Sequence, residues 1–169
     1  LPICALAEFC AARQLSARRW QTRMAAGQAV VAIADAASEE ITSCTPVLLE
    51  VARNRDEHPW VQALALEGLV LLDPRIGRDL LANRLYDAEG GVDFCVRKLA
   101  LGIARRRLPA EVTATHLTRI VDARDPSDHV RLGLVEAAAA LPWPSAAPLL
   151  AALSTSDEVR PKVRARVAM

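Results

Sequence analysis

Four arginines recur at similar intervals along the sequence, and they are its most regular groups able to bind an anion: Arg23, Arg97, Arg131 and Arg160. A guanidinium group forms paired hydrogen bonds with a carboxylate or a phosphate, so these side chains are candidate binding residues. A structural interpretation stands beside this one, in which each arginine bonds to a turn carboxylate or to a carbonyl at a helix end. The spacing alone leaves both interpretations open.

Two denser basic clusters occur further along the chain. Arg105, Arg106 and Arg107 close a predicted helix, where cations stabilise the negative end of the helix dipole. Adjacent helical positions diverge by about 100°, so these three side chains do not form a flat patch for nucleic acid. The second cluster consists of Arg160, Lys162, Arg164 and Arg166. It is expected to face either a further repeat or a partner.

The histidines and cysteines show no spacing typical of a metal site or of a catalytic pair. They are His58, His116 and His129, together with Cys4, Cys10, Cys44 and Cys95. The histidines form neither H-x-x-x-H nor His-Glu pairs. His58 and His129 lie in the turn or first helical turn of their copies, and we expect solvated turn residues there. The cysteines lack C-x-x-C spacing and lie in apolar helical contexts, which predicts buried free thiols in a cytoplasmic protein. We therefore predict no metal and no cofactor.

The carboxylates offer little for catalysis. Glu67 and Glu136 lie six residues after Val61 and Val130, respectively, and surface charge is expected for both. Acid–base chemistry would require burial that moves their pKa values. The sequence contains no glycine-rich phosphate loop, no G-x-S-x-G motif and no Cys/His pairing. An enzyme is not ruled out, but a non-catalytic protein is favoured.

Helices must position all of these residues. Apolar residues recur at spacings of three and four, whereas alternation with a period of two is almost absent. Of the 169 residues, 52% are hydrophobic and 32 are alanine, the best helix former. Regularly placed Pro, Gly, Asp and Ser divide the chain into ten predicted helices at 2–14, 17–37, 39–54, 58–72, 75–88, 92–107, 110–124, 128–141, 145–153 and 157–168. The predicted fold is all-α, and short loops predict about five antiparallel pairs.

Charge and hydropathy disfavour several partners. A net charge of +1 argues against nucleic acid and against anionic membrane surfaces. No run of about 18 uncharged apolar residues is present, so no membrane span is predicted. The excess of 19 Arg over 2 Lys is typical of a bacterial protein, and the start at Leu1-Pro2-Ile3 predicts a piece of a longer polypeptide. Because both ends look uncapped, end-to-end self-association is also expected.

The second helix of each predicted pair carries a weak repeat. Its anchor positions are Thr22, Val61, Val96, Val130 and Val159, which are 29 to 39 residues apart. An acidic or small polar turn precedes each anchor, and a run of Ala, Leu, Val and Gly follows it. A helix pair cannot bury its apolar face alone, so repeated pairs are expected to stack on one another.

The pattern of a turn with Asp, then Val-Arg, then Ala and Leu at helical spacing resembles the HEAT-like repeat family. The resemblance implies a short α-solenoid over residues 1–169, whose second helices line a concave face. In the family, a turn Asp lies six residues ahead of the Arg and stacks with its counterparts as a ladder. Here Asp125 precedes Arg131 by six residues, and Asp56 precedes Gln62 by six. The other copies have Ala17, Gly91 and Ser154 at this place, so an incomplete ladder is expected.

The resemblance implies a non-catalytic binding scaffold that engages a protein or peptide through its concave face, with Arg97, Arg131, Arg23 and Arg160 as contacts. Two alternatives remain open. One is an enzyme on the same scaffold, either a DNA glycosylase or a bilin-lyase-like protein, and the other is a regulatory or sensor array of a larger NTPase or protease. The glycosylase hypothesis would use Trp60 with Asp56. However, Trp60 follows Pro59 in a first helical turn, where packing against the preceding helix is expected.

Overall fold

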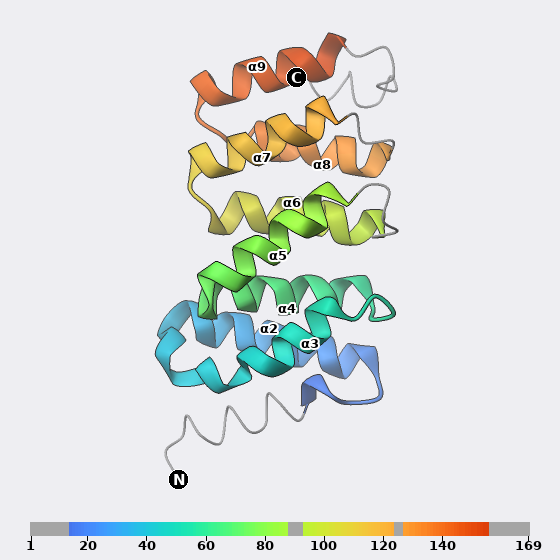
Figure 1. Ribbon diagram of the computed structural model, residues 1–169, viewed down its shortest axis with the longest axis vertical. Helices are drawn as coiled ribbons and strands as arrows, with labels where there is room; N and C mark the ends of the chain where they lie inside the picture. Colours follow the sequence, from blue (N-terminus) through green and yellow to red (C-terminus); the bar gives the residue numbers. More distant parts are fainter. Residues whose placement is uncertain (1–13, 88–92, 124–126, 156–169) are drawn as a thin grey trace. The chain divides into compact units, whose positions relative to one another are not determined.

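The computed structural model describes residues 14–87, 93–123 and 127–155, and Figure 1 shows them as a succession of helices. Across these three ranges the structure contains helices, turns and bends but no strand. This confirms the all-α fold class. No helix in this part of the chain is both long enough and apolar enough to cross a membrane. The predicted helix 157–168 and most of the predicted helix 2–14 lie outside the described residues.

Eight α-helices and one 3-10 segment make up the described residues. They are α2 (Trp20–Ala37), η1 (Ser38–Cys44), α3 (Thr45–Arg53), α4 (Pro59–Leu72), α5 (Pro74–Tyr86), α6 (Phe94–Arg107), α7 (Ala110–Asp122), α8 (Asp128–Ala138) and α9 (Trp143–Thr155). Apart from α3, each α-helix begins and ends within three residues of a predicted range. The helical periodicity of the sequence therefore located these elements correctly.

The predicted helix 39–54 is wrong in its first six residues, which belong to the 3-10 segment η1. Ile41 has φ −129° and ψ 22°, which are not helical values, and it is 1% exposed. An α-helix begins again at Thr45, with Pro46 in its first turn. Proline is favoured there because its missing N–H would have no partner within the helix anyway. The break lets Ile41 enter the core, which the spacing of apolar residues did not indicate.

Local hydrogen bonds define where two of the helices begin. At the start of α6, the Asp93 carboxylate accepts a hydrogen bond of 2.6 Å from the N–H of Cys95. At the start of α4, His58 Nδ1 accepts one of 3.3 Å from the N–H of Trp60. Both acceptors satisfy amide groups that have no partner in their own helix.

The chain divides into two compact units, Leu1–Leu81 and Ala82–Met169. In the first unit, α4 packs against α2, α3 and η1. Its residues from Val61 to Val70 are buried, except for a partly exposed Leu64. Gly27 on α2 permits the close approach, because a Cβ at Gly27 would lie 2.9 Å from Leu64 Cβ. Helix α4 is therefore the central helix of this unit.

In the second unit, α6 packs against α8, and both α7 and α8 pack against α9. The core side chains of this unit that are at most 2% exposed include Leu101, Ile103, Leu117 and Leu134. Gly133 of α8 lies at the contact with α6, where a Cβ would be 3.2 Å from the side chains of Leu101 and Lys98. In each unit, helices that are next but one in the chain are therefore neighbours.

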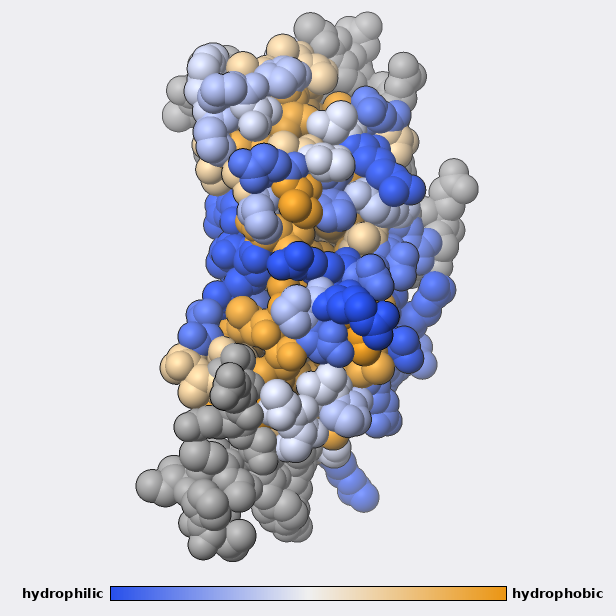
Figure 2. Space-filling view, turned by 60° about the vertical axis from the view of Figure 1, so that its left-hand side comes forward, coloured by the Kyte–Doolittle hydropathy of each residue, from blue (hydrophilic) through white to orange (hydrophobic). Residues whose placement is uncertain are grey.

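A few large hydrophobic side chains are exposed in the part of the chain that the structure describes. They are Trp143, Trp60, Phe94 and Val112, with exposed fractions of 73%, 54%, 42% and 36%. The prediction that Trp60 packs against the preceding helix is wrong, because more than half of the residue faces solvent. On the face drawn in Figure 2, hydrophobic residues reach the surface in small areas that are separated by hydrophilic ones.

Candidate functional site

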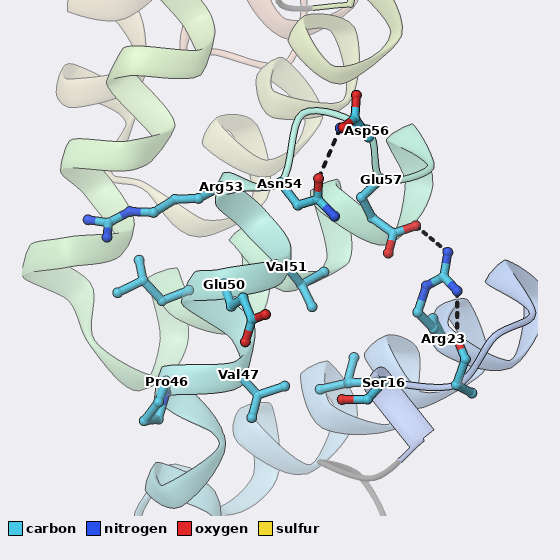
Figure 3. A pocket seen from close by; sticks show the side chains of 13 residues that line it. Ser16, Arg23, Pro46, Val47, Glu50, Val51, Arg53, Asn54, Asp56 and Glu57 are labelled. Carbon is cyan, nitrogen blue, oxygen red and sulfur yellow. Dashed lines mark hydrogen bonds and ion pairs between the residues drawn. The ribbon is translucent and has the colours of Figure 1, made fainter.

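A groove of about 900 Å³ lies in the first unit, beside α3. Residues 15–17, helix α3 and the turn 54–57 line it, together with Arg23 of α2 (Figure 3). We call this surface the α3 groove. Apolar side chains such as Val47 and Val51 line it together with the carboxylates of Glu50 and Asp56.

Helix α3 supplies most of the groove because it is amphipathic. Leu48 and Ala52 face the core and are 0% and 2% exposed. Val47 and Val51 are half-buried, and Glu50 is exposed. Val47 and Val51 are four residues apart and therefore share one face of the helix. The groove thus has an apolar stripe with a carboxylate beside it.

The turn after α3 is held by its own hydrogen bonds. The N–H of Asn54 donates to the carbonyl oxygens of Glu50 and Val51, at 3.0 and 3.3 Å, where α3 ends. Asn54 Oδ1 accepts a 3.0 Å hydrogen bond from the N–H of Asp56, the local bond of an Asx turn. These bonds fix the backbone that carries Asp56 at the groove.

An ion pair between Arg23 and Glu57 joins α2 to this turn. Arg23 Nη2 lies 2.6 Å from Glu57 Oε1, and Arg23 Nη1 donates to the carbonyl oxygens of Ala17 and Arg18 at 2.6 and 2.9 Å. Glu57 Oε1 also accepts a 2.7 Å hydrogen bond from the N–H of His58. Three segments that line the groove are therefore tied together (Figure 3).

In two successive copies of the repeat, the residue after the anchor position donates a hydrogen bond to a backbone carbonyl oxygen of the preceding turn. Arg23 bonds to the carbonyl oxygen of Ala17, and Gln62 Nε2 donates to the carbonyl oxygen of Glu57 at 2.7 Å. Asp56, which precedes Gln62 by six residues, is exposed and is not the acceptor of that bond. The sequence interpretation missed Glu57, although it lies in the acidic turn 34 residues after Arg23, which is close to one repeat step.

Two of the other predicted binding arginines, Arg97 and Arg131, lie in the described part of the second unit. Arg97 is 4% exposed; burial lowers its pKa, and the carboxylates of Asp87 and Asp93 act in the opposite direction. Arg131 Nη1 lies 3.6 Å from Asp128 Oδ1. Arg160 lies outside the described residues, as does Asp125 of the expected ladder. Arg23 thus makes the contacts of the structural interpretation, whereas Arg131 pairs with a carboxylate at the start of its own helix. Binding by any of the four stays a prediction.

Two histidines stack on aromatic rings at the beginnings of helices. The rings of His58 and Trp20 are parallel within 1°, with centroids 3.8 Å apart. The rings of His129 and Phe94 lie 4.9 Å apart. His58 lies in the turn before α4, as expected, but it is half-buried rather than fully solvated, whereas His129 is exposed.

His116 belongs to a cluster in the second unit that the sequence did not suggest. Its Nδ1 forms a hydrogen bond with the hydroxyl group of Tyr86, and the guanidinium carbon of Arg119 lies 4.0 Å from the centre of the Tyr86 ring. Burial lowers the pKa of His116, and the positive charge of Arg119 lowers it further. His116 lies within α7, inside the predicted helix 110–124, and is half-buried.

The predictions for the cysteines and for the two glutamates of α4 and α8 are confirmed only in part. Neither Cys44 nor Cys95 is in a disulfide bond; Cys44 is buried and Cys95 partly exposed. Burial together with Asp93 raises the pKa of Cys95. Glu136 is exposed, as expected, but Glu67 is 5% exposed because α4 is surrounded by its neighbours. In the part of the chain described, no group of three or more His, Cys, Asp or Glu residues is arranged to hold a metal ion.

Comparison with known proteins adds no relative to this description. Protein-family models, curated proteins and solved structures all give no match to the chain. The resemblance to HEAT-like repeats therefore stays a prediction from the sequence. Any functional conclusion must come from the groove and the contacts that hold it.

Proposed function

We propose that the chain is a non-catalytic scaffold that binds a short segment of a protein or peptide in the α3 groove. The observation that carries the proposal is the mixed lining, in which half-buried Val47 and Val51 lie with exposed Glu50 and Asp56. Apolar side chains supply affinity by leaving water, and polar groups around them fix orientation. The volume of about 900 Å³ falls within the range of roughly 300–1,000 Å³ typical of ligand sites.

The groove is also well suited to binding because its walls are fixed before a partner arrives. The pair of Arg23 and Glu57 joins α2 to the turn 54–57, and Asn54 bonds within that turn. A preformed surface loses less conformational entropy on binding than a mobile one. We place this scaffold in the cytoplasm, where the free thiols of Cys44 and Cys95 would stay reduced.

We further propose that the helices stack as HEAT-like pairs in a short α-solenoid. Two findings support this arrangement: the contacts between next-but-one helices in each unit, and the similar bonds made by Arg23 and Gln62. The arginines after the anchors then hold turns in place, and those whose guanidinium groups reach the surface of the second helices offer secondary contacts to a partner. These arginines are Arg23, Arg97, Arg131 and Arg160.

Selection from a random peptide library displayed on phage tests the proposed function, with the 169-residue chain as the target. Selected peptides should bind the unmodified chain and lose most of their affinity for Val47→Lys, because the lysine places a charge on the apolar stripe of the groove. Val112→Lys is the matched control, since Val112 is a partly exposed valine of α7 in the other unit. Peptides that bind both variants equally well, or a library that yields no binder, would contradict the proposal.

A further inference from the structure

We infer that the segment held in the α3 groove is cationic, with an apolar side chain flanked by Lys or Arg. This inference rests on the proposed function and names the chemistry of its partner. Several charged side chains line the groove, and only some of them are paired with another charge of the chain.

One pair of opposite charges at the groove is already satisfied internally. Arg23 and Glu57 lie 2.6 Å apart, and their side chains are only 19% and 6% exposed. Each also bonds to the backbone, Arg23 to Ala17 and Glu57 to His58. Neither group is therefore available to a partner without breaking contacts that hold the groove together.

The charges that remain at the groove are those of Glu50, Asp56 and Arg53. All three residues are exposed, and in the described part of the chain neither carboxylate has a recorded ion pair or side-chain hydrogen bond. Figure 3 shows the guanidinium group of Arg53 pointing away from the other labelled charged side chains. A partner in the groove thus meets two carboxylates that have no counter-charge among the described residues, and a cation complements them.

The apolar part of the groove adds a second requirement. Val47 and Val51 are half-buried and stand one helical turn apart, with Glu50 between them in sequence and Asp56 on the following turn. Apolar side chains gain by covering these valines, whereas polar ones would lose hydration. An apolar residue between basic residues therefore matches both the stripe and the carboxylates.

Fluorescence anisotropy of labelled peptides tests the inference on the full 169-residue chain. The probe is Gly-Lys-Lys-Val-Leu-Val-Lys-Lys-Gly, and its comparison peptides carry Glu or Gln in place of every Lys. The basic peptide should bind roughly tenfold more tightly than the acidic one, because several weak exposed ion pairs add together. Its affinity should fall as salt is added, since the charges are exposed.

A pair of double variants locates the effect. Glu50→Gln with Asp56→Asn should weaken binding of the basic peptide about fivefold. Asp122→Asn with Glu136→Gln makes the same change in net charge at exposed residues of the second unit and should leave the affinity unchanged. Circular dichroism confirms that both variants stay folded.

The outcomes separate the inference from the proposed function. If the acidic or neutral peptide binds as well as the basic one, or if both double variants lose affinity equally, the cationic partner is wrong. If Val47→Lys abolishes peptide binding in either of these outcomes, the proposed scaffold function is still supported. If no peptide binds, or if Val47→Lys leaves binding unchanged, the inference and the proposed function both fail.

Discussion

Arg23 and Glu57 face each other at one side of the α3 groove, and both side chains are largely buried. A buried ion pair adds little stability compared with apolar residues of similar size, because both charges must leave water. Removing only one partner is different, since the other charge then stays buried without compensation. The pair therefore matters for the geometry of the turn 54–57 more than for the total stability.

Substituting Arg23→Met should destabilise the chain by about 3 kcal/mol, because the Glu57 carboxylate would stay buried without its cation. Urea unfolding followed by circular dichroism measures the change. Arg19→Met is the control, since Arg19 is exposed and surface substitutions usually change stability by less than about 0.5 kcal/mol. Equal unfolding midpoints for the two variants would show that the pair has no such role.

His116 predicts a dependence of stability on pH. Because burial and Arg119 lower its pKa in the folded chain, the unfolded chain binds the proton more readily. The contribution of neutral His116 to the free energy of unfolding is fully present above the ordinary histidine pKa of about 6.5. It is lost as the pH falls from there through the lowered pKa. The free energy of unfolding should therefore fall more steeply below about pH 6.5 in the unmodified chain than in His116→Gln.

The exposed His129 of the same unit provides the control for this measurement. His129→Gln should keep the steep decrease, whereas His116→Gln should reduce it. The prediction would be wrong if His116→Gln kept the same slope as the unmodified chain, because the proton uptake would then belong to other groups.

At the scale of elements, the contact between α2 and α4 depends on Gly27. A Cβ at this position would lie 2.9 Å from Leu64 Cβ, which is not the mobile end of a side chain. Gly102 in α6 is different, because a Cβ there would meet only the terminal Nη1 of Arg106, at 3.2 Å. Substitutions at Gly27 therefore report on close packing between helices, whereas substitutions at Gly102 report mainly on helix propensity.

The same substitution should have opposite effects at these two positions. Gly27→Ala should lower the free energy of unfolding by about 1 kcal/mol, because overpacking of roughly 1–3 kcal/mol outweighs the gain in helix propensity. Gly102→Ala should raise it by up to about 1 kcal/mol, since the arginine can move aside. Thermal and urea unfolding measure both values, and stabilisation by Gly27→Ala would show that α2 and α4 are not held this close.

At the scale of the whole molecule, we propose that the chain associates with a second copy of itself. Helix α9 contains no charged residue, and its first residue, Trp143, is 73% exposed. Two copies related by a twofold axis can cover the same apolar surface on each other. An uncharged helix suits this pairing, because no like charges are brought together.

Sedimentation equilibrium checks this proposal. The average mass should rise above that of one chain as the concentration increases, and Trp143→Gln should shift the rise to higher concentration. Trp60→Gln is the control, because Trp60 is also exposed but belongs to a different helix. A single species with the mass of one chain at high concentration would overturn the proposal.

The amino-acid sequence by itself determined where most of the described helices lie, because helix formation depends on local spacing and on residues such as Pro59 and Asp93 at helix starts. It could not determine which polar groups are buried, since burial depends on how helices far apart in the chain pack together. Glu67 was expected at the surface, but α4 is enclosed by α2, α3 and η1. Glu57 pairs with Arg23, which lies 34 residues earlier in the chain, and the 3-10 break coincides with the buried Ile41. The α3 groove is likewise a product of tertiary structure, because three separate segments must meet to form it.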